Sequence, residues 1–512
     1  MPRTEREPER TYNFSLAPSR SIFMGLSTGE AGLAAGALMF GAIALSAHVP
    51  IPIAALPAVL VLIATLRIVR GENLIAWASP MAAYALGQRT WFGRCEMGIA
   101  HGDELSESGR SPFSPLPPMP AEPEKRKAWR VSAAKARKAK AERLPIEMRG
   151  LSIRGLPSHG QEVGLVSHER TARVVTAVAQ VSSTDPFLML PAAERGYALA
   201  SFGAVLDGIC TEEERIACVS WSERVVPDLG DQADAFLAAS SGNDALREDY
   251  ANLVDRLDTA AQLHEVYLGL SVKIDKIDDK HLAEAEYEIS HFFAQWSALN
   301  YRVEMLSADD LHLLIQATLE GMPRAYYDRA RRSLAVPTAE KVEWSHMQID
   351  GLYHRGYAVQ AWPRVPVGSR MLAPVLQAQT PGVARTFTVH WQPTKPSVAR
   401  RRVRMQVTRA EVAKESRRRS GLVHSARVDR EAADAAKRDE EQTAGYNEHR
   451  IAGIGLVSAP SLDLLQSGAR RFEQGANRSN LEVHPLWGRQ RESWVAALPF
   501  GQVRFHTSLL EF

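Results

Sequence analysis

The chain has 512 residues, of which 45% are hydrophobic and 23% charged, and its formal net charge at pH 7 is +2. This length has room for two or three domains. The overall composition is ordinary, but charged and apolar residues are strongly segregated along the chain. The three cysteines, Cys95, Cys210 and Cys218, match no metal-binding or disulfide framework, so they predict reduced cytoplasmic thiols.

The first informative segment is Ala31–Leu66, which contains no Asp, Glu, Lys or Arg and is interrupted by Pro50 and Pro52. A single membrane-spanning helix needs about 20 apolar residues, and prolines break a helix at its centre. The sequence therefore predicts a transmembrane helical hairpin over residues 31–69, preceded by a polar tail over residues 1–30. A cleaved signal peptide and a buried soluble hairpin fit this pattern less well.

Arginines flank the apolar run on both sides, and the turn between its two halves carries no formal charge. Lys and Arg in short loops stay on the cytoplasmic side of a membrane. The expected topology is therefore a two-pass protein of the plasma membrane with both termini in the cytoplasm. Gly32 and Gly36 form a small-xxx-small pair that allows two such helices to approach closely.

Residues 70–94 predict a juxtamembrane helix, in which Trp77, Tyr84 and Trp91 suit the membrane interface. Residues 95–143 predict a linker, proline-rich at first and basic from Lys125 to Arg143. A basic cluster beside a membrane binds anionic lipids, at about 1 kcal/mol per basic residue near the surface. Nucleic-acid binding is the rival interpretation, although Trp129 is the only aromatic residue interleaved with this basic run.

Residues 144–512 predict a cytoplasmic mixed domain of the α+β class, because strand-like and helix-like patterns alternate along it. Strands, or in the first case a strand or hairpin, are expected at 164–181, 216–226, 264–273, 301–306, 357–363, 386–392, 451–457 and 481–484. Helices are expected at 191–209, 244–263, 281–299, 309–320 and 461–474. Asp309 or Asp310 is expected to help cap the helix that ends at Glu320.

Two helical patterns have distinct faces. In the helix at 281–299, one apolar stripe predicts the buried side: Ala285, Ile289, Phe292, Phe293 and Trp296. The segment at about 397–445 is instead highly charged, and Arg400–Arg419 alone holds nine basic and two acidic residues. It predicts one long solvated helix, a helical pair or an exposed insertion, with a weak heptad pattern for a coiled-coil partner.

Motifs for chemistry are scarce. Gly25–Gly29 matches the hydrolase pattern G-x-S-x-G, but it precedes the apolar run rather than following a strand in a sheet. Gly453 and Gly455 lack the third glycine of a dinucleotide fingerprint, and no P-loop occurs. Glu288 and His291 lie three residues apart without a second such pair. The sequence thus predicts no catalytic, cofactor-binding or metal-binding residues and a protein that is not an enzyme.

Several short segments together resemble a family of actinobacterial membrane proteins associated with type IV, conjugation-like secretion. The carrying residues are Thr11-Tyr12, Gly25-Leu26, Val359–Arg364 with Val367-Gly368, the arginine-rich helix after Thr386–Pro393, Leu486–Gln490 and Ala496–Pro499. In that family a small two-helix inner-membrane subunit is joined to a domain like the amino-terminal part of the conjugative traffic ATPase. The resemblance implies such a domain without the motor. The proline-rich linker, Arg489 and Arg491 depart from the family pattern.

The resemblance implies a non-catalytic scaffold subunit of a secretion complex, anchored in a membrane with anionic lipids and oligomeric within the complex. Its expected partners are a separate P-loop traffic ATPase and other channel subunits. Two alternatives remain. One is a membrane component of a type VII-like secretion system, which also combines two amino-terminal helices with a cytoplasmic domain. The other is a membrane-tethered nucleic-acid-binding protein that uses the basic runs at 125–143 and 400–419.

Overall fold

The computed structural model describes the central part of the chain almost continuously and short pieces before it. The described residues are 36–37, 39–43, 46, 81–82, 84–87, 89–92, 122–145, 148–158, 160–168, 173–183, 187–228, 237, 239, 243–258, 262–299, 301–326, 337, 339–363, 365–377, 380–419 and 426–501. Within these ranges, no helix combines the length and apolar character that a membrane crossing requires. Most of the predicted hairpin at 31–69, and all of the tail at 1–30, lie outside them.

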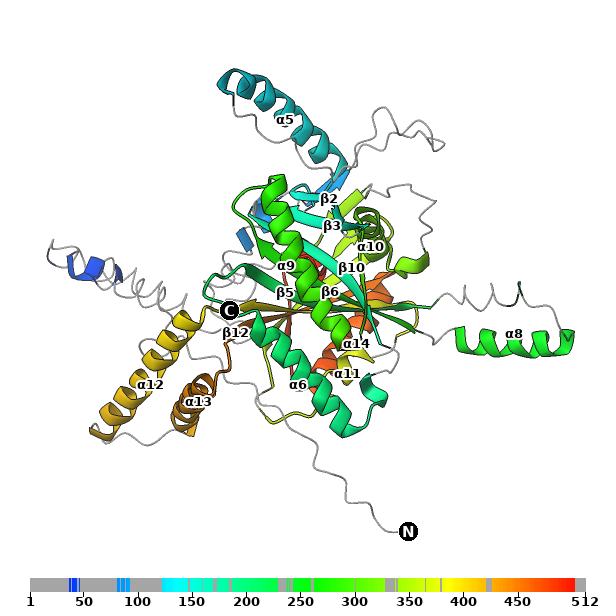
Figure 1. The fold of residues 1–512 in the computed structure, drawn as a ribbon. Helices are drawn as coiled ribbons and strands as arrows, with labels where there is room; N and C mark the ends of the chain where they lie inside the picture. The colour runs from blue at the N-terminus through cyan, green and yellow to red at the C-terminus, as the bar shows by residue number, and fades with distance from the viewer. Residues whose placement is uncertain are drawn as a thin grey trace, which may run out of the picture.

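The domain is of the α+β class, as predicted, and is built on one large antiparallel sheet of 13 strands (Figure 1). Along the sheet the order is β1-β8-β9-β10-β12-β11-β5-β6-β4-β3-β2, while β13 pairs with β10 and β7 pairs with β4. The elements that precede the two halves of the domain are β1 (Thr90–Phe92) and α5 (Pro123–Arg143).

The domain consists of two halves with the same topology. The first half contains β2 (Leu151–Ser158), β3 (Gln161–His168), β4 (Val174–Ser182), α6 (Ala192–Gly208), β5 (Ile216–Pro227), α8 (Asp244–Asp258), β6 (Gln262–Lys273), α9 (Asp279–Ala298), β7 (Arg302–Met305) and α10 (Ala308–Glu320). The second contains β8 (Ala339–Val342), β9 (Met347–Ile349), β10 (Leu352–Ala361), α11 (Ala373–Leu376), β11 (Ala384–Pro393), α12 (Pro396–Arg419), α13 (Ala426–Thr443), β12 (His449–Ala459), α14 (Leu462–Arg478), β13 (Glu482–Pro485) and α15 (Gln490–Ala497).

The two halves meet edge to edge where β5 pairs with β11 in antiparallel register, with Trp221 opposite Val389. Moving outward from this pair, the strand order β5-β6-β4-β3-β2 in the first half repeats as β11-β12-β10-β9-β8 in the second. The β5–β6 connection contains α8, and the equivalent β11–β12 connection contains α12 and α13. Because β5 and β11 run in opposite directions, these two insertions leave the sheet at opposite ends.

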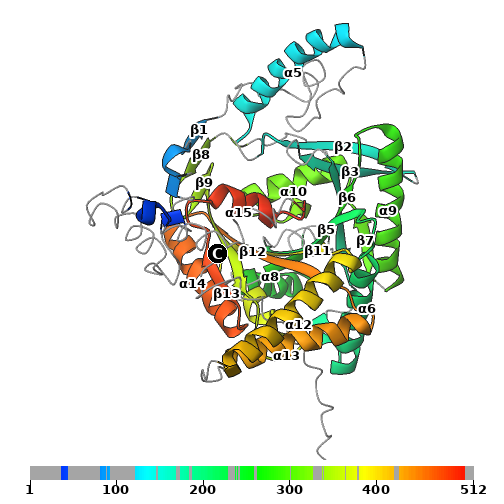
Figure 2. The same cartoon turned by 90° about the vertical axis from the view of Figure 1, so that its left-hand side faces the viewer.

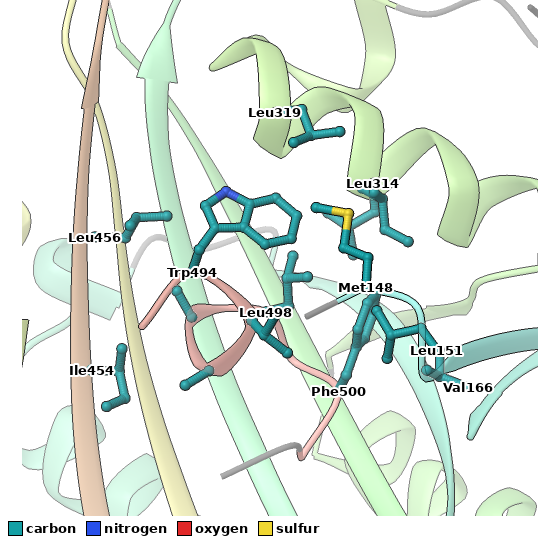
Figure 3. Packing of buried hydrophobic residues seen from close by; sticks show 14 of the residues in the cluster. Met148, Leu151, Val166, Leu314, Leu319, Ile454, Leu456, Trp494, Leu498 and Phe500 are labelled. Carbon is teal, nitrogen blue, oxygen red and sulfur yellow. The ribbon is translucent and has the colours of Figure 1, made fainter. Parts of the chain in front are cut away.

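Helices cover both faces of the curved sheet (Figure 2). On one face, α6 and α9 cover the first half and α14 covers the second, over two separate apolar clusters. On the other face, α10, α15 and the segment after α15 share a single cluster with residues from both halves. Trp494, Leu498 and Phe500 converge there on Met148 and Leu314 (Figure 3). This cluster joins the two halves into one core.

Strand β4 shows why both faces are covered. Val175, Ala177 and Ala179 point to the cluster under α6 and α9, whereas Val178 belongs to the cluster shared by α10 and α15. Successive side chains of a strand alternate between faces, so apolar residues at adjacent positions need cover on both sides. Full burial of one such side chain contributes about 1.5–3 kcal/mol.

The predicted elements of this domain are largely confirmed. The strand or hairpin predicted at 164–181 is the β3–β4 hairpin, and α6, α9, α10 and α14 lie where helices were expected. All five predicted residues of the buried α9 stripe are buried. The helix predicted to reach Leu263 ends at Asp258, because β6 already begins at Gln262. Strands β2, β8 and β9 and helices α11 and α15 were not predicted.

Helix α10 begins with a capping box. Ser307 is the N-cap residue and accepts a hydrogen bond from the Asp310 amide, while the Asp310 carboxylate accepts one from the Ser307 amide. Asp310 therefore takes part in the cap, as expected, but from the third helical position rather than the first. Gly321 ends the helix in the left-handed conformation, which glycine adopts without steric cost.

The segment before the linker departs from its prediction. Residues 81–82 and 84–86 are helical, but Thr90–Phe92 form β1, which pairs with β8 rather than continuing the predicted helix to residue 94. Trp91 is 5% exposed and is buried in the protein rather than at a membrane interface. The Tyr84 ring packs edge-on against Trp344, with 5.2 Å between centroids. Of the three aromatic residues expected at the interface, Trp91 is thus part of the sheet, Tyr84 packs on Trp344, and Trp77 lies outside the described residues.

Candidate functional site

One strongly charged surface feature is a helical pair, α12 and α13, which we call the arm. It settles the prediction for 397–445: the described residues form two helices rather than one. Ala399 and Val403 of α12 and Ala435 of α13 are buried, and Arg438 of α13 donates a 2.8 Å hydrogen bond to Gln406 of α12. The two helices therefore pack against each other while their outer faces stay in solvent.

The base of the arm is fixed to the end of α6 by polar contacts. The Glu212 carboxylate accepts hydrogen bonds from the Ser397 amide (2.9 Å) and hydroxyl (2.7 Å), which lower the pKa of Glu212. On the returning chain, the Asn447 amide donates to Asp207 at 3.0 Å. Because both ends of the insertion are held, the arm projects from the sheet in a defined direction.

Cys210 and His449 lie beside this base, with 3.4 Å between Sγ and Nε2. Burial raises the pKa of the Cys210 thiol to about 11 and lowers the pKa of His449. At neutral pH the thiol stays protonated, whereas a cysteine nucleophile must be a thiolate. The pair is therefore suited to anchoring β12 against α6 and not to nucleophilic catalysis.

The outward face of α12 combines cations with an apolar floor. A hollow of about 680 Å³ is lined by Arg400, Arg401, Arg404 and Met405, together with Ser397 and Thr408. Arg400 lies 3.7 Å from Glu212, but this ion pair is solvent-exposed and is worth little. Exposed guanidinium groups beside apolar side chains form a surface suited to an acidic partner.

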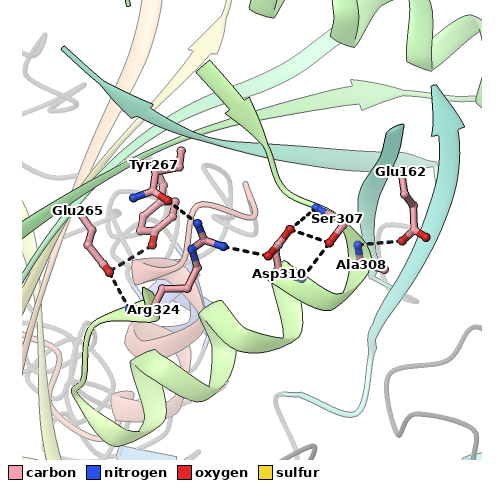
Figure 4. A network of polar contacts seen from close by, with 8 residues as sticks. Glu162, Glu265, Tyr267, Ser307, Ala308, Asp310 and Arg324 are labelled. Atoms are coloured by element: carbon pink, nitrogen blue, oxygen red, sulfur yellow. Dashed lines mark hydrogen bonds and ion pairs between the residues drawn. The ribbon is translucent and has the colours of Figure 1, made fainter. Parts of the chain in front are cut away.

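A second polar cluster is buried at the end of α10 (Figure 4). Glu265 accepts hydrogen bonds from Arg224 (2.5 Å), from the Tyr267 hydroxyl (3.1 Å) and from the Arg324 amide (2.7 Å). The Arg324 guanidinium donates to Asp310 at 3.0 Å and to Gln180. The charges in this cluster neutralise one another, so it joins α10 to β4, β5 and β6 rather than presenting a free acid or base.

A third polar group, which we call the hydroxyl band, runs across β4, β6, β5 and β11 on the face opposite α6. Its members are buried: Thr176, Ser271, Ser220, Ser222, Thr388 and His390. The chain at Ala496–Gly501, which we call the C-terminal strap, crosses this band. Thr388 and His390 donate to the carbonyls of Ala497 (2.6 Å) and Ala496 (2.8 Å).

Further along the strap, Thr176 donates to the Phe500 carbonyl at 3.0 Å. A Cβ atom at Gly269 would lie 1.9 Å from the Pro499 carbonyl oxygen, so only glycine admits the strap at this point. Carbonyls in the last turn of a helix, and in the irregular chain after it, must find other partners when they are buried. The hydroxyl band supplies them, and the strap thereby connects α15 of the second half to the first half.

Among the described residues, the candidates from the sequence are not brought together into one reactive site. The Gly25–Gly29 motif and Cys95 lie outside the described residues. Gly455 makes room for the ring of Phe472, which explains the glycine without a nucleotide. Glu288 lies 3.2 Å from Arg215, and the His291 ring stacks on Tyr287. Among the described residues, no group of three or more His, Cys, Asp and Glu is placed to hold a metal ion.

Of the segments that carried the family resemblance, Thr11-Tyr12 and Gly25-Leu26 lie outside the described residues. Others, and the departure at Arg491, make contacts within the domain. Trp362 lies against Gly453, Gln490 accepts from the Gly356 amide at 2.9 Å, and Arg491 forms a two-bond pair with Glu340. The sequence did not identify the hydroxyl band, whose members are common residues far apart along the chain. No protein-family model matches the chain. No curated protein matches it either.

Proposed function

We propose that this protein is a non-catalytic, membrane-anchored scaffold subunit of a type IV, conjugation-like secretion system, and that it docks a separate traffic ATPase. The proposal places a two-pass hairpin at 31–69 in the plasma membrane, with both termini in the cytoplasm. The α+β domain then acts by position rather than by chemistry, and the short sequence segments quoted above supply the link to secretion.

The observation that carries the proposal is the pairing of β1 with β8. Thr90 lies opposite Lys341 and Phe92 opposite Ala339, and Trp91 between them is buried. Arg89 lies over the Tyr84 ring, 4.4 Å from its centroid, and its carbonyl accepts from the Val342 amide. The chain that follows the apolar run is therefore attached directly to the sheet edge, which suits an anchor that must orient a domain.

Topology is tested by expressing the full-length chain in bacteria and labelling single cysteines introduced at Ser15, Ala47 or Ser183 in a variant without native cysteines. A membrane-impermeant maleimide should label position 47 in intact cells and positions 15 and 183 only after lysis. Labelling of position 183 in intact cells, or recovery of the chain outside the membrane fraction, would contradict the anchor.

The docking role is tested by affinity purification of the detergent-solubilised, full-length protein from its own host, followed by mass spectrometry. A P-loop traffic ATPase and small membrane subunits should co-purify. Trp91→Ala should release the sheet from the anchor and lower their yield several-fold, whereas Phe92→Ala is the matched control because Phe92 is 77% exposed. Recovery of a type VII complex or of nucleic acid in place of the ATPase would reject the proposal.

A further inference from the structure

The sheet forks beside strand β4, and a groove lies at the fork. Strand β3 pairs with one end of β4 through Leu165–Ser167, whereas β7 pairs with the other end through Arg302–Met305. The two branches meet where the Gly164 amide donates a 2.7 Å hydrogen bond to the Leu306 carbonyl. The groove has a volume of about 1000 Å³ and is lined by β3, α9, β7 and the start of α10.

Strand β7 turns one row of backbone groups toward this groove. The Leu306 amide donates to the Val178 carbonyl of β4 at 2.8 Å. Backbone groups alternate sides along a strand, so those of Val303 and Met305 face away from β4. Within the part of the chain that the structure describes, β7 pairs with β4 alone. Backbone donors and acceptors at such an edge are a template for another extended chain.

Helix α9 forms a wall of the groove with room for small side chains. The side chains of Val303 and Met305 pack on the cluster under α6 and α9. On the same side, Phe293, Ala294 and Ser297 of α9 line the groove, and the last two are exposed. A strand added beside β7 would turn every second side chain toward this wall. Small apolar side chains at those positions therefore fit the groove.

The two ends of β7 lie beside exposed charges of opposite sign. Arg302 is the first residue of the strand and is exposed. At the other end the exposed Glu162 accepts a 3.1 Å hydrogen bond from the Ala308 amide (Figure 4). The four residues of β7 span roughly 13 Å. A chain antiparallel to β7 would place an acidic side chain opposite Arg302 and a basic one near Glu162, and opposite charges across two strands are favourable.

We propose that this groove binds a short extended segment of another protein, which adds to β7 as an antiparallel strand. The segment carries a basic residue at its amino-terminal end, small apolar residues at alternate positions and an acidic residue opposite Arg302. A row of backbone partners recognises an extended peptide rather than a helix or a nucleic acid. The inference rests on β3, β7 and α9 and does not depend on the proposed role in secretion.

The probe for the test is the peptide Lys-Val-Thr-Val-Glu, amidated at its end and labelled with fluorescein at its amino terminus. Fluorescence anisotropy measures its binding to the full-length protein in detergent, and binding should be saturable. In the proposed register both valine nitrogens face β7 and the threonine nitrogen faces away. Methylation of the two valine nitrogens should weaken binding on the order of tenfold or more, whereas methylation of the threonine nitrogen should have a smaller effect.

Two substitutions on α9 locate the bound peptide. Ala294→Trp fills the groove and should weaken binding on the order of tenfold or more. Ala283→Trp is the matched control, because Ala283 is also exposed on α9 but does not line the groove. It should bind the probe as the wild type does.

A charge exchange tests the direction of the added strand. Arg302→Glu should weaken binding of the probe and favour the peptide Lys-Val-Thr-Val-Lys, because the new carboxylate then faces a lysine. Absence of saturable binding to the wild type would overturn the proposal, including the case in which another segment of the same chain already fills the groove. Equal binding by the two tryptophan variants, or by the two methylated peptides, would overturn it as well.

Discussion

At the scale of single residues, the buried Glu265 holds three donors from three parts of the chain. Arg224 belongs to β5, Tyr267 to β6, and the Arg324 amide follows α10. Burial, with the nearby Glu265 charge, raises the pKa of the Tyr267 hydroxyl, so Tyr267 remains a hydrogen-bond donor at physiological pH. Glu265 is therefore a carboxylate through which β5, β6 and the chain after α10 are held together.

Glu265→Gln should lower the free energy of unfolding by about 3–5 kcal/mol, because it leaves the Arg224 guanidinium buried without its counter-charge. Urea unfolding of the full-length protein in detergent measures this. The control is Glu213→Gln, which removes a pair with Arg215 in solvent and should change stability by about 0–1 kcal/mol. Equal unfolding midpoints for the two variants would contradict the structural role of the cluster.

The buried His390 makes the free energy of unfolding depend on pH. It is fully buried between the Ser220 hydroxyl and the Ala496 carbonyl, and burial lowers its pKa to about 4. Between the ordinary value of 6.5 and about 4, the unfolded chain binds a proton there and the folded chain does not. Stability should therefore fall as pH falls through this window, by about 1.4 kcal/mol per pH unit for this residue.

Burial also lowers the pKa of His354 to about 3 and the pKa values of His312, His346 and His449, so these residues act in the same direction. Urea midpoints measured between pH 7 and pH 5 give the slope. His390→Gln keeps a donor for the Ala496 carbonyl but cannot titrate, so its slope should be shallower than that of the wild type. An unchanged slope would show that His390 is already protonated in the folded protein.

At the scale of elements, Gly269 on β6 determines whether the C-terminal strap can lie on the sheet. Gly269→Ala places a methyl group against the Pro499 backbone, which a strand and a strap cannot both accommodate without moving. The expected cost is about 1–3 kcal/mol, together with faster hydrogen–deuterium exchange in the strap.

The control for this substitution is Gly196→Ala in α6, where a Cβ meets no atom within 4 Å. Alanine favours a helix over glycine by about 0.5–1 kcal/mol, so this variant should be slightly more stable than the wild type. If both alanine variants exchange the strap amides at the wild-type rate, the close approach at Gly269 does not limit the strap.

The elements differ in how well they can be predicted from the sequence. Helix α9 was predicted with its buried face because five apolar residues recur at helical spacing and all pack on the sheet. Strands β8 and β9 were missed because they have four and three residues, too few to show a period. Strand β9 pairs with β8 and β10, and β8 also pairs with β1, which lies far away in sequence.

The hydroxyl band shows a different limit of prediction from the sequence. On β5 and β11 the alternation of apolar with polar residues is that of strands with one face in water. Ser222 and Thr388 are nevertheless buried, because the strap covers them from more than a hundred residues away in sequence. Only the tertiary structure could show that this face meets backbone carbonyls rather than solvent.

At the scale of the whole molecule, the two halves are arranged as one cooperative unit. The sheet is continuous through the β5–β11 pair, and the C-terminal strap of the second half lies on strands of the first. The core shared by α10 and α15 draws residues from both. The cluster under α10 and α15 is therefore incomplete without residues of both halves.

A protease site inserted between residues 327 and 336 tests this arrangement. After cleavage, the two fragments should remain together through gel filtration and separate only in denaturant, because the junction and the strap hold them. An intact chain treated with protease serves as the control for cleavage elsewhere. Separation of the fragments under native conditions would show that the halves are independent domains.

The pairing of β1 with β8 also sets an order of events during synthesis. Thr90 lies opposite Lys341, so β1 has no partner until the ribosome has passed that residue. Everything between these strands must emerge first, including the whole first half of the domain. The first of the described strands to be made is thus paired only after the strands of the first half have been made. A newly made chain that stalls before β8 carries an unpaired edge strand and an exposed Trp91, and both are features by which quality-control machinery recognises unfinished protein.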